Sequence, residues 1–192
     1  MQCAKSKKNL NKPGAKMAEI VKNELKYDHF YDQKNKQHYL NGTLIVLHCH
    51  HYTALYTQLA LDANETELLK ETARDSFRKM LNTYLKKYYT GNSIREIMEL
   101  CCQYHSILGL GQMKVIFLGE DSGEVEMVAS HVDEGWKKKF GIYDRPINYI
   151  SAGFIEAMFE VVLGTNPKEF SAIETQSIVM GATTSKFNVI RR

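Results

Sequence analysis

The chain has 192 residues, of which 44% are hydrophobic and 24% charged, and its net charge is +3 at pH 7. These values are typical of a soluble globular domain. They exclude a disordered or fibrous chain, and no stretch approaches the roughly 18 apolar residues of a membrane span. The small basic surplus argues against nucleic acid as a partner, and the four cysteines form no spaced disulfide framework, so we expect reduced thiols in a cytoplasmic protein.

The N-terminal quarter of the chain gives weak signals. Residues 1–16 carry five lysines and predict a flexible basic lead-in, which leaves residues 17–192 as one domain. Residues 17–25 predict a short helix, and the polar and aromatic residues 26–39 predict a loop or a covering segment. After the Asn41-Gly42 turn signal, the β-branched residues 43–48 predict a short buried strand.

Three helices are expected in the middle of the chain. The first runs from about Tyr52 to residue 62 or 63, and Ser93 and Glu96 form a capping box that begins the third. The second helix begins at Asn64 or Thr66 and ends at Gly91. Its apolar stripe advances by three or four residues and consists of Leu69, Ala73, Phe77, Met80, Tyr84 and Tyr88.

Alternating side chains predict two β-hairpins in the C-terminal half. The first joins residues 113–117 to residues 125–129 through a turn at Asp121-Ser122-Gly123. An apolar helix over residues 154–162 follows, and a second hairpin turns near Gly181. This order predicts an α+β fold, in which a mainly antiparallel, twisted sheet of two hairpins packs against several helices.

The hairpins, the small residues Ser151-Ala152-Gly153 and the tail residues Glu174, Gly181, Phe187 and Val189 together resemble the 4-vinyl reductase domain family. That superfamily also includes the small core subunits of the TRAPP tethering complex. The resemblance implies a domain, often a homodimer, with an internal cavity for an apolar, aromatic or tetrapyrrole ligand.

In sensor members of the family, two tail cysteines and an upstream acid hold a zinc ion. The matching residues here are Ser177 and Ser185, whose hydroxyl groups are poor zinc ligands, so we expect the tail zinc site to be absent.

The densest set of potential ligands is the run from His48 to Tyr52, which includes Cys49, His50 and His51. Imidazole and thiol groups suit zinc, iron, copper or haem. The alternative is a purely structural role, in which one histidine is buried and hydrogen-bonded while the others cap a helix or face solvent.

If the first hairpin strand continues to His131, that imidazole points inward with Asp133 two residues further on. The predicted metal ligands are then His48, His50, His131 and Asp133, and the candidate cofactors are zinc, iron or haem. The alternative is that Asp133 caps a helix starting at Glu134, on which Trp136 is a packing anchor.

We therefore expect a homodimeric protein that binds a small apolar, aromatic or tetrapyrrole-type molecule in an internal cavity. The candidate ligand-binding residues are His48, His50, His51, Tyr52, Tyr104, His105 and Trp136, although Tyr104 and His105 stand at a helical spacing that also fits the core. Two alternatives stay open: a metal-dependent enzyme that uses the same cavity, and a structural subunit of a protein complex.

Overall fold

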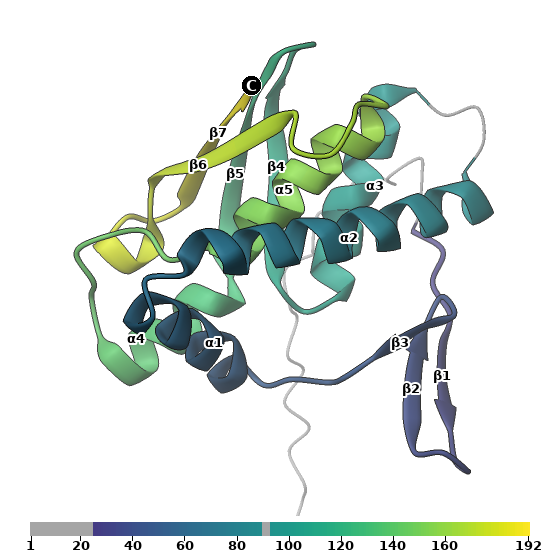
Figure 1. The fold of residues 1–192 in the computed structure, drawn as a ribbon, viewed down its shortest axis with the longest axis horizontal. Helices are drawn as coiled ribbons and strands as arrows, with labels where there is room; N and C mark the ends of the chain where they lie inside the picture. Colours follow the sequence, from purple (N-terminus) through teal and green to yellow (C-terminus); the bar gives the residue numbers. More distant parts are fainter. Residues whose placement is uncertain (1–24, 90–92) are drawn as a thin grey trace, which may run out of the picture.

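A computed structural model describes residues 25–89 and 93–192, which form a four-stranded sheet covered by helices and a separate three-stranded sheet (Figure 1). The helices are α1 (His50–Asp62), α2 (Thr66–Tyr88), α3 (Ile94–Ile107), α4 (His131–Phe140), α5 (Tyr149–Val162) and the single 3-10 turn η1 (Ile178–Met180). The strands are β1 (His29–Asp32), β2 (Gln37–Leu40), β3 (Thr43–Ile45), β4 (Gly111–Leu118), β5 (Ser122–Ser130), β6 (Phe170–Gln176) and β7 (Ser185–Arg191). The basic lead-in, the helix predicted at 17–25 except for Leu25, and Gly91 lie outside the described residues.

The main sheet has the order β4-β5-β7-β6, and every neighbouring pair is antiparallel. Val125 of β5 pairs with Val115 of β4 and with Phe187 of β7, so the two predicted hairpins join side by side. The predicted α+β class is confirmed, as are the three helices of the middle segment within a few residues.

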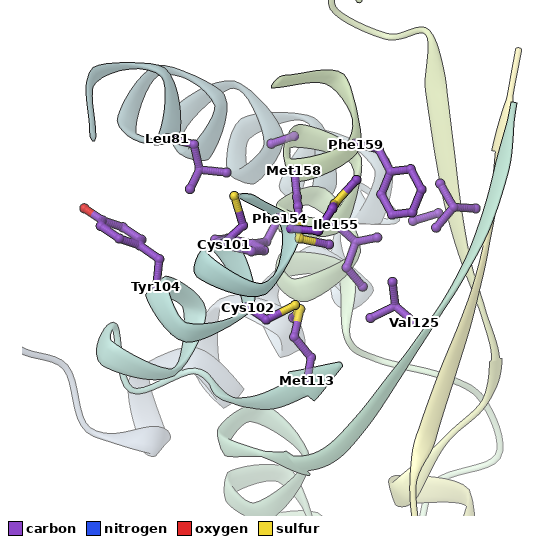
Figure 2. Close-up of a cluster of buried hydrophobic side chains, with 14 of the residues drawn as sticks. Leu81, Cys101, Cys102, Tyr104, Met113, Val125, Phe154, Ile155, Met158 and Phe159 are labelled. Atoms are coloured by element: carbon purple, nitrogen blue, oxygen red, sulfur yellow. The ribbon is translucent and has the colours of Figure 1, made fainter. Parts of the chain in front are cut away.

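Helix α5 forms the centre of the molecule. Every residue from 151 to 160 is buried, and Phe154, Ile155 and Phe159 pack with side chains of the sheet, α2 and α3 (Figure 2). These side chains occupy the layer between the main sheet and the helices, where the sequence predicts an internal cavity. Any sizeable binding site must therefore be sought at the edge of this layer.

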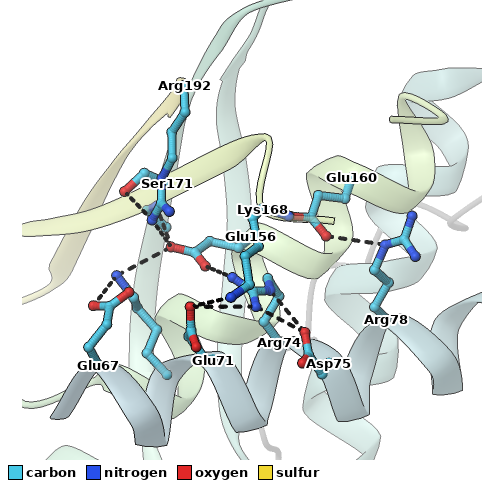
Figure 3. Close-up of polar contacts among 12 residues, drawn as sticks. Glu67, Glu71, Arg74, Asp75, Arg78, Glu156, Glu160, Lys168, Ser171 and Arg192 are labelled. Carbon is cyan, nitrogen blue, oxygen red and sulfur yellow. Dashed lines mark hydrogen bonds and ion pairs between the residues drawn. The ribbon is translucent and has the colours of Figure 1, made fainter. Parts of the chain in front are cut away.

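Two glutamates on α5 are buried against α2 and pair with its basic side chains (Figure 3). Arg74 Nη1 lies 3.7 Å from Glu156 Oε2, and Arg78 Nε lies 3.2 Å from Glu160 Oε2. The helices approach so closely that a Cβ atom on Gly153 would lie 2.4 Å from the carbonyl oxygen of Lys70. The small-residue segment of α5 thus allows this contact, and the ion pairs keep the buried charges compensated.

Two local predictions are wrong. Residues 29–45 form the three-stranded sheet β1-β2-β3. The loop predicted at 26–39 therefore contains strands, and the strand predicted from residue 43 is present as β3 but is not buried. Leu44 is 55% exposed and Val46 is 71% exposed, because the sheet projects from the body and no second layer covers these side chains. His131 does not continue β5: Ser130 accepts a hydrogen bond from the backbone N–H of Asp133 and thereby caps α4, which starts at His131.

The helices of the described segments are all too short or too polar to cross a membrane. Cys49, Cys101 and Cys102 are free thiols, as expected, and burial raises the pKa of Cys102 to about 12.

Candidate functional site

An apolar groove of about 730 Å³ lies between the three-stranded sheet and the body of the protein. We call it the β3–α1 groove. It is lined by Tyr27, His29, Leu40 and Leu44 of the small sheet and its approach, residues 45–48, Thr53 of α1, Met80 of α2 and residues 107–110 after α3. Few of these side chains are polar, and the volume is within the range of about 300–1,000 Å³ that is typical of small-molecule sites.

The groove exists because the chain leaves β3 as an extended segment before α1 begins. Residues 46–49 have no regular secondary structure, and Val46 and Leu47 are 71% and 65% exposed. The segment therefore spans the distance between the small sheet and the body without closing the space beneath it. The other wall is the end of α3, where the left-handed conformation of Gly109, at φ +77°, turns the chain toward β4.

His48 is the one predicted ligand residue that lines this groove in the described structure. Its ring meets Tyr52 edge-on at a centroid distance of 5.2 Å and Tyr56 at 5.8 Å. These contacts restrict the orientation of the imidazole. The second imidazole of the groove, His29, lies 3.0 Å from a nitrogen of His38 and is part of the segment predicted as a loop.

Three other histidines form a separate cluster at the start of α1 and α4. The ring of His50 lies 4.2 Å from that of His51 and 5.4 Å from that of His131, measured between centroids. Burial lowers the pKa of His50, and the neighbouring basic groups of His51, Lys138 and His131 lower it further, so the neutral imidazole is favoured. Its Nε2 atom is shielded from solvent and lacks a hydrogen-bond partner in the described structure.

The predicted metal set does not converge. Within residues 25–89 and 93–192, no group of three or more His, Cys, Asp or Glu side chains is arranged to hold a metal ion. His48 faces the groove, His50 and His131 meet at the helix starts, and Asp133 is buried in a different cluster. Metal binding by the histidines stays a prediction that would require their side chains to move.

Asp133 belongs to a buried cluster built around Asn148, which precedes α5. The Asn148 amide nitrogen donates to Asp133 Oδ2 at 2.7 Å and to Glu174 Oε1 at 2.9 Å, while its Oδ1 accepts from Ser130 Oγ at 2.9 Å. The backbone N–H of Asn148 donates to Glu174 Oε2 at 3.1 Å. A single amide side chain thus joins β5, α4 and β6.

Burial raises the pKa of both carboxyl groups in this cluster above the ordinary range. For Glu174, the hydrogen bond from Asn148 opposes that rise, whereas the nearby negative charge of Asp133 adds to it. Ser177 and Ser185, which stand where the resemblance implies cysteines, are both buried beside the cluster, and Ser185 Oγ accepts from the backbone N–H of Ile178 at 3.0 Å. This hydrogen bond joins the first residue of η1 to the first residue of β7.

Three predicted ligand residues are core residues. Tyr104 is 1% exposed and packs against Tyr84, with a centroid distance of 4.7 Å. His105 is completely buried against Phe154, and burial lowers its pKa to about 4. Trp136 is 1% exposed in a small second core, where it packs as the helix anchor that was the alternative interpretation. Tyr52 is half exposed on the outer side of α1.

Sequence reasoning missed most of the groove and the central role of Asn148. The groove residues come from five separate segments, and a single sequence contains no signal that brings these together. Asn148 could have been noticed, because asparagine directly before a helical stretch is a preferred N-cap residue.

Comparison with known proteins rests on structure alone, since no protein-family model and no curated protein matches the sequence. The crystal structure of the sensory domain of the transcription activator PoxR, with phenol, superposes with a TM-score of 0.73. This chain has the fold of that PoxR domain. The match covers 85% of this chain and 84% of the PoxR domain at 13% sequence identity, so the likeness shows the fold and not the function.

A second solved structure is similar over a smaller part. Trafficking protein particle complex subunit 3 from Naegleria fowleri, covalently bound to palmitic acid, matches with a TM-score of 0.51. The match covers 73% of this chain and 90% of that subunit at 14% identity. A tethering-complex subunit, which the sequence resemblance names, is therefore among the structural neighbours.

Proposed function

We propose that the protein binds a small apolar or aromatic molecule in the β3–α1 groove. The observation that carries this proposal is the groove itself, a space of about 730 Å³ with mainly apolar walls and two imidazoles. Apolar walls provide the binding free energy, since about 25 cal/mol is gained for each Å² of apolar surface removed from water. A few polar groups then fix the orientation of the ligand.

His48 is the group best placed to orient such a ligand. Its ring is held by Tyr52 and Tyr56 on one side while it lines the groove on the other. An imidazole can donate or accept a hydrogen bond, which suits a phenolic hydroxyl or a carboxyl group. The ligand class that fits is therefore an aromatic ring or an acyl chain with one polar end.

The structural neighbours support the same class of ligand. The PoxR domain is described with phenol, and the trafficking subunit is described with palmitic acid. Membership of the 4-vinyl reductase family is part of our proposal, and it accounts for the likeness to both neighbours. A tetrapyrrole ligand, a metal or haem bound by the histidines and a cytoplasmic location remain predictions, as do the enzyme and structural-subunit alternatives.

Binding can be measured with two probes, phenol and the fluorescent N-phenyl-1-naphthylamine, on the purified full chain. Leu44→Asp places a charge in the groove and should weaken the affinity for both probes at least about tenfold, because a charged group is costly to desolvate. Ile116→Asp is the matched control: Ile116 is a strand residue of similar exposure, 49% against 55%, and does not line the groove.

A second variant separates the role of His48 from that of the walls. His48→Ala should weaken phenol binding about tenfold and change the naphthylamine affinity much less, because the larger aromatic surface of that probe supplies most of its binding free energy. Equal affinities of the wild type, Leu44→Asp and Ile116→Asp would reject the groove as the binding site, as would failure of the wild type to bind either probe.

A further inference from the structure

The end of α4 presents basic and exposed apolar side chains on one short turn. The three lysines at 137–139 are exposed in the last turn of the helix, which ends at Phe140. Gly141 then turns the chain with a φ of +79°, and the next residue, Ile142, is 72% exposed. We call residues 137–145 the α4 tip.

The α4 tip is held in place by packing on both sides of Ile142. The rings of Phe140 and Tyr143 lie 4.6 Å and 4.9 Å from the ring of Trp136, measured between centroids, and Trp136 is buried in the small second core. The backbone N–H of Tyr143 donates to the carbonyl oxygen of Val179 at 2.9 Å, which joins the tip to η1. Ile142 is therefore exposed although its neighbours are packed.

The α4 tip is strongly basic for its length. Its nine residues have a net charge of +3, which equals the net charge of the whole chain. The basic residues are Lys137, Lys138, Lys139 and Arg145, and the one acid is Asp144. Lys139 Nζ lies 4.9 Å from the centre of the Phe140 ring, and the Arg145 guanidinium group lies 5.7 Å from that of Tyr143. Cations and aromatic rings thus share one surface.

A membrane surface that contains anionic lipids matches both properties of this tip. Its head groups attract lysine and arginine side chains. An interfacial segment enters the boundary between head groups and acyl chains by about 5–10 Å, so Phe140 and Ile142 can leave water while the lysine ammonium groups stay among the head groups. A partner that is only a polyanion, such as a nucleic acid, would pair with the cations and leave these two apolar side chains in water.

Met180 of η1 extends the apolar part of this surface. It is 48% exposed and directly follows Val179, whose carbonyl oxygen binds the tip. Helices α4 and η1 lie at one end of the molecule, whereas the small sheet and the C-terminal end of α2 lie at the other (Figure 1). The residues of the tip do not line the β3–α1 groove. Membrane binding and ligand binding can therefore be tested independently.

We propose that the protein binds reversibly to membranes with anionic lipids through the α4 tip. Phe140 and Ile142 enter the interface, and Lys138 and Lys139 pair with the lipid head groups. The contact is peripheral and needs no spanning helix. Because it uses one short segment, it is weak and decreases with salt, which screens the attraction between the lysines and the head groups.

The test is cosedimentation of the full chain with sucrose-loaded vesicles. One set of vesicles consists of phosphatidylcholine alone, and the other also contains about 30% phosphatidylserine, an anionic lipid. The wild type should bind the second set at least about tenfold more strongly, and about 0.5 M NaCl should remove most of that difference.

A pair of charge variants locates the contact. Lys138→Gln/Lys139→Gln should weaken binding at least about tenfold, because each lysine near an anionic surface contributes about a fivefold gain in affinity. Lys86→Gln/Lys87→Gln is the matched control. It removes the same charge from the last turn of α2, where Lys87 also lies over an aromatic ring, that of Tyr88, at 4.9 Å. Its effect should be less than about threefold, because salt screens charges that lie more than about 10 Å from the head groups.

An apolar variant tests insertion while every charge is kept. Ile142→Ser should weaken binding about tenfold, because the isoleucine side chain no longer gains from leaving water. Ile116→Ser is the control, since Ile116 is an exposed isoleucine of β4. If the lysine variant loses binding and Ile142→Ser does not, the tip meets an acidic macromolecule without insertion, and the membrane proposal is overturned.

Circular dichroism should give the same spectrum for all four variants and the wild type, since all the substituted side chains are exposed. No measurable binding of the wild type to phosphatidylserine vesicles at about 1 mM lipid would overturn the proposal. Equal losses in the two lysine variants would also overturn it. Larger losses in the tip variants than in their controls support it.

Discussion

Asn148 is the residue on which three elements of the fold depend. Its amide group donates to Asp133 and to Glu174, which are both buried acids, and accepts from Ser130. The arrangement neutralises neither carboxyl group by an ion pair, because the described structure has no basic side chain within ion-pair distance of either. The ionised form of these two carboxyl groups is therefore unfavourable, and the stability of the folded protein must depend on pH.

Asp133→Asn tests this dependence. Burial raises the pKa of Asp133 above 3.8, so the folded protein binds the proton more tightly than the unfolded chain. Stability is therefore lost as the pH rises from about 4 through the folded-state pKa. Asparagine keeps an oxygen that can accept from Asn148, and it carries no charge. We expect the variant to be more stable than the wild type at pH 7 and the difference to shrink toward pH 4, as measured by urea unfolding.

Two neighbouring charged groups act on the Asp133 carboxyl group. Lys137 favours the charged form of Asp133, and Glu174 faces it as a second acid. The control is Asp28→Asn, which replaces an exposed carboxylate and should change the stability at pH 7 little. A lower stability of Asp133→Asn than of the wild type at pH 7 would mean that the cluster favours the charged form, contrary to this account.

At the scale of elements, α2 and α5 form the closest helix contact of the fold that we describe. The backbone of α2 lies within 3 Å of the place that a side chain on Gly153 would occupy, and the ion pairs of Arg74 and Arg78 with Glu156 and Glu160 line the same contact. The ion pairs thus lie beside Gly153, where the backbone of α2 leaves no room for even a methyl group.

Gly153→Ala should therefore destabilise the protein by about 1–3 kcal/mol, because the added methyl group forces the helices apart and lengthens the ion pairs. The loss would be measured as a shift in the midpoint of urea unfolding. Ser151→Ala is the control on the same helix: the Ser151 hydroxyl is buried with no partner in the described structure, so its removal should be neutral or stabilising. Equal effects of the two substitutions would refute the close-approach argument.

The elements that could be predicted are those with strong local patterns. The stripe of α2, the capping box of α3 and the alternating hairpins depend on residues close in sequence, and each appears in the structure. The three-stranded sheet could not be predicted, since its strands of three or four residues are mostly polar or exposed on both sides. Local chemistry also decided α4, where capping by Ser130 prevailed over continuation of the strand.

The candidate site was harder to predict than the fold. His48 lines the groove, and its contact with a ligand stays a prediction, whereas Tyr104, His105 and Trp136 are buried in cores. Burial depends on which distant segments pack together, and residue type alone does not reveal it. The expected convergence of His131 with His48 fails for a local reason, because the prediction assumed a strand at His131, where α4 starts.

At the scale of the whole molecule, the protein combines a dense body with a small projecting sheet. Hydrogen exchange should show this division. Amides of the buried helix α5 and of β5, which is hydrogen-bonded to β4 and to β7, should exchange only through global unfolding. Those of β1 to β3 should exchange through local opening at much lower free energy. Mass spectrometry of exchanged peptides measures both. Equal protection of the two regions in the unliganded protein would contradict the division.

The small sheet is joined to the body at one end. Leu40 and Asn41 are buried there, and the Tyr84 hydroxyl group donates to the carbonyl oxygen of Lys26 at 2.6 Å just before the sheet, whereas the turn between β1 and β2 is exposed. The sheet is thus attached near Asn41 and free at the opposite end, and the groove lies next to the attached end. We expect a molecule in the groove to rotate the sheet about this end, which would displace the turn further than the residues at the groove. A spin label at Asn35 would therefore detect groove occupancy from a position that no ligand touches.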